Sequence, residues 1–457
     1  MKIDYSKWSK ADLICRLVEL ESSQMILGSS SNFSNSLATS TSPSCSSTPL
    51  STPSTSISIS QTSNNNSNTN SDNKTSDISK KLTSNIISKS KKVKSFDFSK
   101  YPTRPIALRF SYLGWPYQGL ALQSQPTDLP TIESEILNAL FKLRLIPTLD
   151  PKDCSFSRCG RTDRGVSAMN QVISLTVRSK LSKTDQIDVN DHKELDYIRL
   201  LNRALPTSIR FHGVSLHPPT GFDARFSCTF RHYKYIFYGA NMNIENMKKA
   251  AAHYQGHQDF RNFCKIDAAK QIHNFMRRID SSTILPVHGR EGWYVFDLIG
   301  SAFLWHQVRC MVSVLLSVGQ GLEDADIVKH LLNVELFPSR PVYKMAHDVP
   351  LVLWNCGFEN IQWKNSKDGD SHSNTGVEGI GGIWNDYMVK SIVVNMANEI
   401  CGGEREMHDK VRINLGDGIG QMMGKYVDLR KRERLETAKE INARWKGKKR
   451  CLSSESQ

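Results

Sequence analysis

The ten cysteines of this sequence include no C-x-x-C pair, so the sequence offers neither a zinc knuckle nor a thioredoxin-like redox motif. Histidines and cysteines also never gather at the spacing of metal ligands. Cys154 and Cys159 share one segment, and buried packing explains them more simply than ligation does. We therefore predict reduced, individually buried thiols and no metal.

Long apolar segments are absent as well. No apolar run reaches the roughly 18 residues of a membrane-spanning helix, and residues 1–17 lack the apolar core of a signal peptide. We therefore expect an intracellular protein with no membrane partner. The apolar share of the 457 residues is only 39%, which predicts that part of the chain never packs into a core.

Positive charge is in excess, with 59 Lys and Arg against 45 Asp and Glu, a net charge of +14. Contacts between such residues and phosphates supply sequence-independent affinity for nucleic acids. Charge of this size also keeps proteins soluble without any nucleic-acid partner. Composition alone leaves both explanations open.

The first hundred residues divide into two segments. Residues 1–28 contain an apolar stripe that predicts a short amphipathic helix. Residues 29–103 are rich in Ser, Thr and Asn, and we expect a disordered linker because they bury too little apolar surface. The linker has a basic end, with Lys89, Lys91, Lys92 and Lys94. This end suits a nuclear-import signal, a tether that touches RNA or a solvated linker.

The ordered body is expected to begin at Arg104. Hydrophobic periodicity predicts alternating strands and helices. The predicted strands cover 104–115, 171–179, 230–239 and 292–298, and the predicted helices 131–145, 196–205, 243–253 and 303–318. This order predicts an α+β fold with two similar halves, 104–218 and 219–358, the first of them βαβ-like, and a cleft between them.

Two C-terminal segments complete the chain. Residues 359–422 are predicted to be a variable insertion, and residues 365–382 within it are rich in Gly, Ser and Asp. Residues 423–457 are predicted to form a basic helix and tail. Such a helix either lies along an RNA arm or is a solvated charged surface.

The loop at 158–168 is the densest polar segment of the predicted body. Its Asp163 lies between Arg161 and Arg164, bracketed by Gly160 and Gly165. Neighbouring positive charge lowers the pKa of a carboxyl, so we expect Asp163 to be ionised, as a carboxylate nucleophile requires. The alternative is a turn in which Asp163 caps the backbone and the arginines meet solvent.

Three motifs resemble those of one enzyme family. Residues 160–166, GRTDRGV, resemble the signature loop of the TruA-type tRNA pseudouridine synthases. Residues 222–235 contain FDARFS and then RHYKY, which resemble the family's second motif, and 303–309, FLWHQVR, resemble the third. The motifs follow the family's order, and the resemblance extends over residues 104–358.

Two other segments resemble the eukaryotic branch that acts on positions 38 and 39 of the tRNA anticodon arm. They are DFRNFCK at 259–265 and YLGWPYQGLALQ from Tyr112. The resemblance implies a TruA-like α+β fold, with two similar halves, a mixed and antiparallel sheet and a central catalytic cleft. It also implies an isomerase that converts uridine to pseudouridine, with the tRNA anticodon stem-loop as its partner.

The resemblance implies roles for three residues. Asp163 matches the family's catalytic aspartate, Tyr233 the tyrosine that stacks on the target base, and Arg309 the arginine that pairs with the aspartate. Taken singly, Tyr233 also fits cross-strand packing and Arg309 also fits a helix surface. Contacts to RNA are predicted at Arg161, Arg164, Arg231 and Lys234. Lys234 alternates with Tyr233, so it is open whether the lysine faces the other side of the sheet.

The implied reaction breaks the bond between ribose C1′ and N1 of uracil and rejoins the base through C5. The oxidation state does not change, so we predict no cofactor. Attack of Asp163 at C1′, attack at C6 and a glycal route are all open. Tyr233 and Asp163 are both candidates for removing the C5 proton.

Two rival functions are considered. The first is an RNA-binding protein without catalysis, which would have no use for Asp163. The second is a metal-dependent phosphotransferase or nuclease, which would need clustered carboxylates instead of a single acid between arginines.

We expect the chain in the nucleus and the cytoplasm. Whether it forms a homodimer and whether it also modifies messenger RNA are open.

Overall fold

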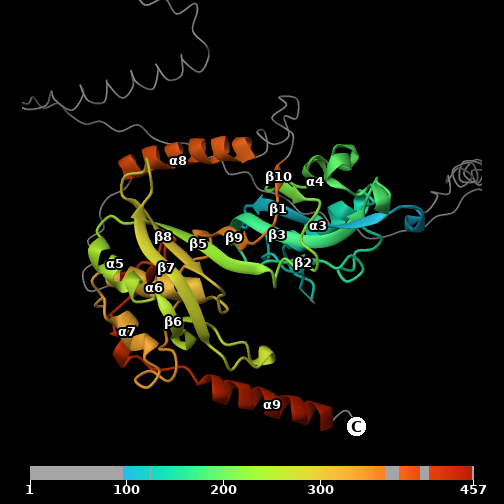
Figure 1. The fold of residues 1–457 in the computed structure, drawn as a ribbon. Helices are drawn as coiled ribbons and strands as arrows, with labels where there is room; N and C mark the ends of the chain where they lie inside the picture. Colours follow the sequence, from blue (N-terminus) through green and yellow to red (C-terminus); the bar gives the residue numbers. More distant parts are fainter. Residues whose placement is uncertain (1–95, 124, 366–379, 402–410, 455–457) are drawn as a thin grey trace, which may run out of the picture. The chain divides into compact units, whose positions relative to one another are not determined.

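The computed structural model describes residues 96–123, 125–365, 380–401 and 411–454, all of which belong to the compact unit 92–457. The predicted helix in residues 1–28 and most of the predicted linker lie outside the described residues. Figure 1 shows the fold. Its strands are β1 Thr103–Tyr112, β2 Ser157–Arg158, β3 Ser167–Arg178, β4 Ile209–Ser215, β5 Cys228–Tyr238, β6 Gly256–Asp259, β7 Met276–Pro286, β8 Trp293–Gly300, β9 Leu351–Phe358, β10 Lys364–Asn365, β11 Val411–Ile413 and β12 Gln421–Met423.

One large sheet runs through both halves in the order β10-β4-β1-β3-β9-β5-β8-β7-β6, with β2 paired to β3 (Figure 1). The pairs of this sheet are antiparallel except for β3 with β9, which are parallel. The first strand of each half lies between two others, β1 between β4 and β3, and β5 between β9 and β8. The predicted α+β fold with two similar halves is confirmed. The βαβ-like interpretation of the first half is wrong, because β1 and β3 pair antiparallel.

The helices are α3 Ile132–Lys142, α4 Tyr197–Ala204, α5 Ile244–Ala252, α6 Gln307–Gly319, α7 Ile327–Leu332, α8 Gly382–Cys401 and α9 Ala438–Ser454. The first three begin where the sequence predicts because a polar side chain caps each start. Thr131 accepts a hydrogen bond from the backbone N–H of Ser134, and Asp196 and Asn243 cap α4 and α5 in the same way. These three predicted helices are confirmed.

Helix α6 is the centre of the C-terminal half. Each of its residues is buried, including Arg309. The helix begins at Gln307 instead of Phe303, because His306 has a left-handed backbone with φ 59° and cannot extend a right-handed helix. A buried helix next to the sheet fixes the position of every side chain at its first turn.

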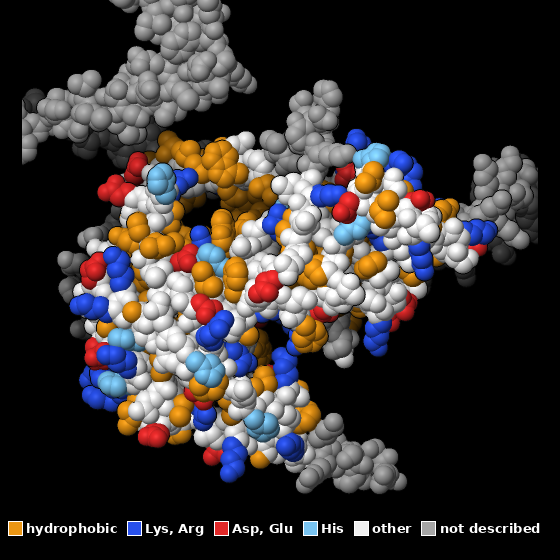
Figure 2. Space-filling view, in the orientation of Figure 1, with side chains coloured by type: hydrophobic (Ala, Val, Ile, Leu, Met, Phe, Trp, Pro, Cys, Tyr) orange, Lys and Arg blue, Asp and Glu red, His pale blue; other side chains and the backbone are white. Residues whose placement is uncertain are grey.

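The two C-terminal segments contain structure that the sequence does not predict. Helix α8 has no buried residue, and Tyr387 touches the body at Trp115, with ring centroids 5.2 Å apart. Its apolar side chains form the orange patch at the top of Figure 2. None of the described helices is long and apolar enough to span a bilayer.

The basic helix α9 begins at Ala438, not near residue 423 as predicted. Residues 433–435 run beside 340–342 instead, where Val342 donates a backbone hydrogen bond to Glu433 and Leu435 donates one to Arg340, both at 2.9 Å. Leu429 and Asn442 are buried. The start of the basic segment therefore packs on the C-terminal half, because tertiary pairing overrides its helical propensity.

Candidate active site

Parallel pairing of β3 with β9 brings two loops together. Ser167 pairs with Val352 near the start of both strands, so the loops that precede β3 and β9 meet at the same end of these strands. The Cα of Gly165 lies so close to Asp348 that a Cβ there would be 2.9 Å from the Asp348 carboxyl carbon. The loop that carries Asp163 therefore adjoins a second acidic residue, which the sequence analysis does not single out.

The segment around Gly119 contacts the loop of Asp163 and holds it in place. The Tyr112 hydroxyl and Thr162 Oγ1 are 2.7 Å apart, and the backbone N–H of Leu120 donates to the Thr162 carbonyl at 3.2 Å. Gly119 has φ 94°, and a Cβ on it would lie 2.8 Å from the Thr162 carbonyl oxygen. Only glycine allows this close backbone approach, which holds the loop of Asp163 in place.

The N-cap and first turn of α6 supply two side chains to the site. His306 Nε2 lies 3.5 Å from Asp163 Oδ2. Arg309 Nη1 lies 3.9 Å from Asp348 Oδ2, and Arg309 Nε donates a hydrogen bond to the Ala346 carbonyl at 2.8 Å. The structure thus differs from the prediction that Arg309 pairs directly with Asp163. Its salt bridge is to Asp348, and its charge acts on Asp163 from a greater distance.

Burial raises the pKa of Asp163 above its usual range, and the positive charge of Arg309 only partly opposes this effect. The prediction of a lowered pKa is wrong, because burial outweighs the nearby positive charge. Arg161 and Arg164 are exposed, and neither forms a hydrogen bond or salt bridge with another described residue. They remain available for contacts with an anionic partner.

His306 is a neutral group in this site. Burial, together with the charge of Arg309, lowers the pKa of His306 to about 3. Its Nδ1 is buried and has no hydrogen-bond partner among the described residues. The imidazole therefore carries no charge at neutral pH and does not neutralise Asp163.

Tyr233 lies in β5 next to the loop that follows β8. Its ring packs edge to face against Phe303 with centroids 5.0 Å apart, and burial raises its pKa far above the usual range. Asp163 is close enough to contribute to this shift. The Tyr233 hydroxyl makes no hydrogen bond to any described residue, so it is a protonated donor without an internal acceptor.

Two of the predicted RNA contacts have other partners. Arg231 donates hydrogen bonds to the carbonyls of Ser301, Cys159 and Arg225 at 2.7, 3.0 and 3.1 Å. It therefore links the segment that precedes Asp163 with the residue that follows β8. Lys234 lies 3.7 Å from Asp297 and 4.3 Å from the centre of the Trp354 ring. It therefore faces away from Tyr233. Both side chains therefore have partners within the protein, and their contacts with RNA stay predictions.

Among the described residues, one group could offer three ligand atoms to a metal ion: Asp188, Asp191 and His217. Lys364 forms an ion pair with Asp191, and Arg104 lies 3.8 Å from the same carboxylate. The negative charge of Asp191 is thus already paired with two cations. Because the group adjoins β10 at the edge of the sheet, it is separate from the loop of Asp163.

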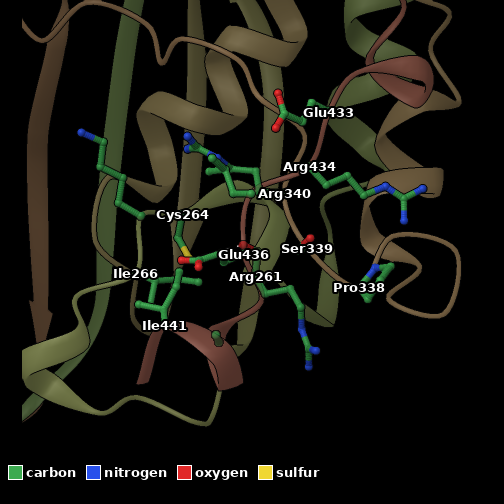
Figure 3. Close-up of a pocket in the computed structure, with 13 residues that line it drawn as sticks. Arg261, Cys264, Ile266, Pro338, Ser339, Arg340, Glu433, Arg434, Glu436 and Ile441 are labelled. Atoms are coloured by element: carbon green, nitrogen blue, oxygen red, sulfur yellow. Dashed lines mark hydrogen bonds between the residues drawn. The ribbon is translucent and has the colours of Figure 1, made fainter. Parts of the chain in front are cut away.

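A cavity of about 460 Å³ lies between residues 261–266 and the C-terminal segment 433–441 (Figure 3). Cations and acids both line it, among them Arg340, Arg434, Glu433 and Glu436. Asp163 is not among its lining residues. This cavity is the seam along which the C-terminal segment packs, whereas Figure 2 shows a separate hollow between the two halves of the body.

Comparisons with known proteins point to one family. A family model described as tRNA pseudouridine synthase matches residues 250–359. A Saccharomyces cerevisiae protein named tRNA pseudouridine(38/39) synthase is 51% identical over 365 residues, which cover 79% of this chain and 82% of that protein. The human protein of the same name is 39% identical over 327 residues, covering 68% of this chain and 66% of its own length. A Caenorhabditis elegans protein named probable tRNA pseudouridine synthase tag-124 is 36% identical over 337 residues and is covered over 82% of its length.

Proposed function

This chain belongs to the tRNA pseudouridine synthase family, and on that premise we propose that it isomerises uridines 38 and 39 of the tRNA anticodon stem-loop. The names of the yeast and human relatives support these positions. One observation carries the proposal: Tyr233 and Arg309 come from two segments distant from Asp163 in the sequence, and each is close enough to Asp163 to interact with it electrostatically. A protein that only binds RNA has no need for this arrangement.

Asp163 is proposed to begin cleavage of the C1′–N1 bond and later to accept the C5 proton. A carboxylate with a raised pKa is a stronger base than an ordinary aspartate. Tyr233 does not suit proton removal, because its raised pKa keeps the phenol protonated at neutral pH. Its ring and its free hydroxyl suit stacking on the target base and donating a hydrogen bond to it.

Arg309 is proposed to stabilise negative charge in the site while the glycosidic bond is broken and reformed. Its guanidinium is fixed by the Ala346 carbonyl and by Asp348, so little reorganisation is needed when negative charge develops on the base or returns to Asp163. Arg161 and Arg164 are exposed beside Asp163, and we assign them to phosphates next to the target.

The location of the protein in the cell and its oligomeric state are tested separately. The lysines at 89–94 support a protein found in the nucleus as well as the cytoplasm. Fluorescent tagging with and without these lysines tests the location. Whether one chain or a homodimer binds each tRNA is decided by sedimentation of the complex at defined concentrations.

The test of the function is direct. The purified full chain is incubated with an unmodified tRNA that carries uridine at positions 38 and 39, and pseudouridine is then mapped by nucleotide. We expect conversion at these two positions, in the presence of a strong chelator, and no conversion when they are changed to cytidine. Tight binding without conversion at any position would favour an RNA-binding protein without catalysis.

A further inference from the structure

An exposed aromatic ring with two cations beside it lies next to the candidate active site. Trp305 is 41% exposed, which is high for so large an apolar side chain. The Lys265 and Lys270 ammonium groups lie 5.9 and 5.6 Å from the centre of its ring. We call these three residues the Trp305 platform. Water-exposed tryptophan flanked by lysine is typical of surfaces that bind single-stranded nucleic acid.

The Trp305 platform is joined to Asp163 by direct contacts. The Trp305 and His306 rings are 4.6 Å apart, and His306 Nε2 is 3.5 Å from Asp163 Oδ2. The Trp305 side chain also acts to lower the pKa of Asp163, which favours the ionised carboxylate. The exposed ring is therefore only one side chain away from the proposed nucleophile.

The charges around the ring favour an anionic ligand. Lys265 is exposed and forms no salt bridge within the described ranges, and its backbone N–H donates to the Trp305 carbonyl at 3.0 Å. Lys270 is paired with Asp267 at 2.9 Å. The hydrogen bond with Lys270 is the main cause of the lowered pKa of Asp267, and Arg161, from the loop of Asp163, adds a smaller contribution of positive charge. The local balance is thus positive beside an open aromatic face.

We propose that the Trp305 platform is a second nucleotide subsite, which binds an unpaired nucleotide adjacent to the target uridine. The base of that nucleotide stacks on the exposed face of Trp305, and its phosphate lies against Lys265. This inference rests on the proposed function, because it takes the RNA that enters the site of Asp163 as the ligand. Holding the neighbouring nucleotide stabilises the RNA with the target unstacked, a state that is unfavourable in the free RNA.

The protein side of the proposal is tested by binding. Affinity for the tRNA is measured in the Asp163→Asn background, so that no turnover occurs. Trp305→Ala should weaken binding about 10-fold or more, whereas Trp305→Phe should bind nearly as the parent does because phenylalanine still offers a ring. Lys265→Ala should reduce the slope of log affinity against log salt by roughly 0.7, the value for one phosphate contact on a single strand.

The chain offers a matched control in Trp354. This residue is also 41% exposed and also has a lysine over its ring, Lys234 at 4.3 Å, but it lies on the face of the sheet opposite to Tyr233. Trp354→Ala should leave the affinity for tRNA unchanged. Melting temperatures of all variants show whether each protein is folded.

The RNA side of the proposal is tested by removing the base of a nucleotide that flanks the target. Two tRNAs are made in which the nucleotide on one side of the target or the other lacks its base. One of them should bind the parent about 10-fold more weakly and lose no further affinity with Trp305→Ala, because both changes remove the same stacking contact. The inference is overturned if neither RNA shows this coupling, if Trp305→Ala binds normally, or if Trp354→Ala weakens binding equally. Conversion of uridine by the unsubstituted chain, measured separately, tells a failure of the subsite from a failure of the proposed function.

Discussion

At the scale of single residues, the environment of Asp163 determines both its chemistry and its effect on stability. A carboxyl whose pKa is higher in the folded chain than in the unfolded chain holds its proton more tightly when folded. Its contribution to stability is present at acidic pH and is lost as the pH rises through the raised pKa. At neutral pH the ionised Asp163 therefore lowers the free energy of unfolding, as strained active-site groups often do.

Asp163→Asn should abolish turnover and make the protein slightly more stable. The amide cannot act as nucleophile or base, so we expect the rate to fall at least roughly 10⁴-fold while the affinity for tRNA is kept. The melting temperature at neutral pH should rise by about 1–4 °C, because the amide removes a buried charge and Arg309 keeps its partner Asp348. Calorimetry beside the activity assay checks both parts. A normal rate in the folded variant would disprove the role of Asp163.

Asp348→Asn should shift the acid limb of the pH profile to lower pH. Activity requires ionised Asp163, so kcat/KM should fall as the pH drops through the pKa of this group. The negative charge of Asp348 raises that pKa and the positive charge of Arg309 lowers it. Arg309→Gln should therefore shift the limb the opposite way. His306, with a pKa of about 3, does not titrate in this range. Profiles that coincide for all three proteins would contradict the coupling.

At the scale of elements, the site depends on loops more than on the strands and helices that carry them. The loop of Asp163 is fixed by the segment around Gly119 on one side and by Asp348 on the other. Arg231 ties its start to the end of β8 through three carbonyls. Such close backbone contacts leave the carboxylate little freedom, which is what preorganised catalysis needs.

Gly119→Ala should lower kcat and stability together. The new Cβ would lie 2.8 Å from the Thr162 carbonyl, so the loop of Asp163 must shift, and φ 94° disfavours alanine by roughly 1–2 kcal/mol. Gly418→Ala is the matched control, since Gly418 has φ 74° with open space around it. Single-turnover assays and chemical denaturation compare the two. An equal loss of turnover in both variants would show that strain alone, rather than displacement of the loop, is responsible.

At the scale of the whole molecule, all the proposed catalytic groups lie in the unit 92–457. The segment around Leu415 belongs to this unit. Leu415 accepts hydrogen bonds from the His347 backbone N–H at 2.7 Å and from the Tyr235 hydroxyl at 3.2 Å, directly behind Asp348. The segment is therefore a support of the active site, although the sequence predicts a variable insertion there.

Removal of residues 1–95 should leave catalysis on naked tRNA within a few-fold of the full chain. Most of this segment, from residue 29 on, has the composition of a linker, and the three motifs lie downstream of it. Turnover at saturating tRNA measures the effect. A folded truncation that has lost its turnover would show that the N-terminal segment takes part in the site.

The starts of α3, α4 and α5 could be predicted from the sequence because a helix start is a local event. Thr131, Asp196 and Asn243 cap the backbone within a few residues of themselves. The motif around Asp163 was recognisable for a similar reason, since a short loop carries its residues together. Strand β7 escaped prediction because its polar residues, such as Arg277 and Asp280, break the apolar alternation.

By itself, then, the sequence determined the family resemblance, the two alternating halves and the residues Asp163, Tyr233 and Arg309 as candidates. Only the tertiary structure decided that Arg309 forms its salt bridge with Asp348 and that Lys234 lies on the face of the sheet opposite to Tyr233. It also decided that the pKa of Asp163 is raised. The reason is physical. Charges adjacent in sequence, such as Arg161 and Arg164, are screened by water when exposed, whereas burial and contacts between distant segments set the electrostatics of a site.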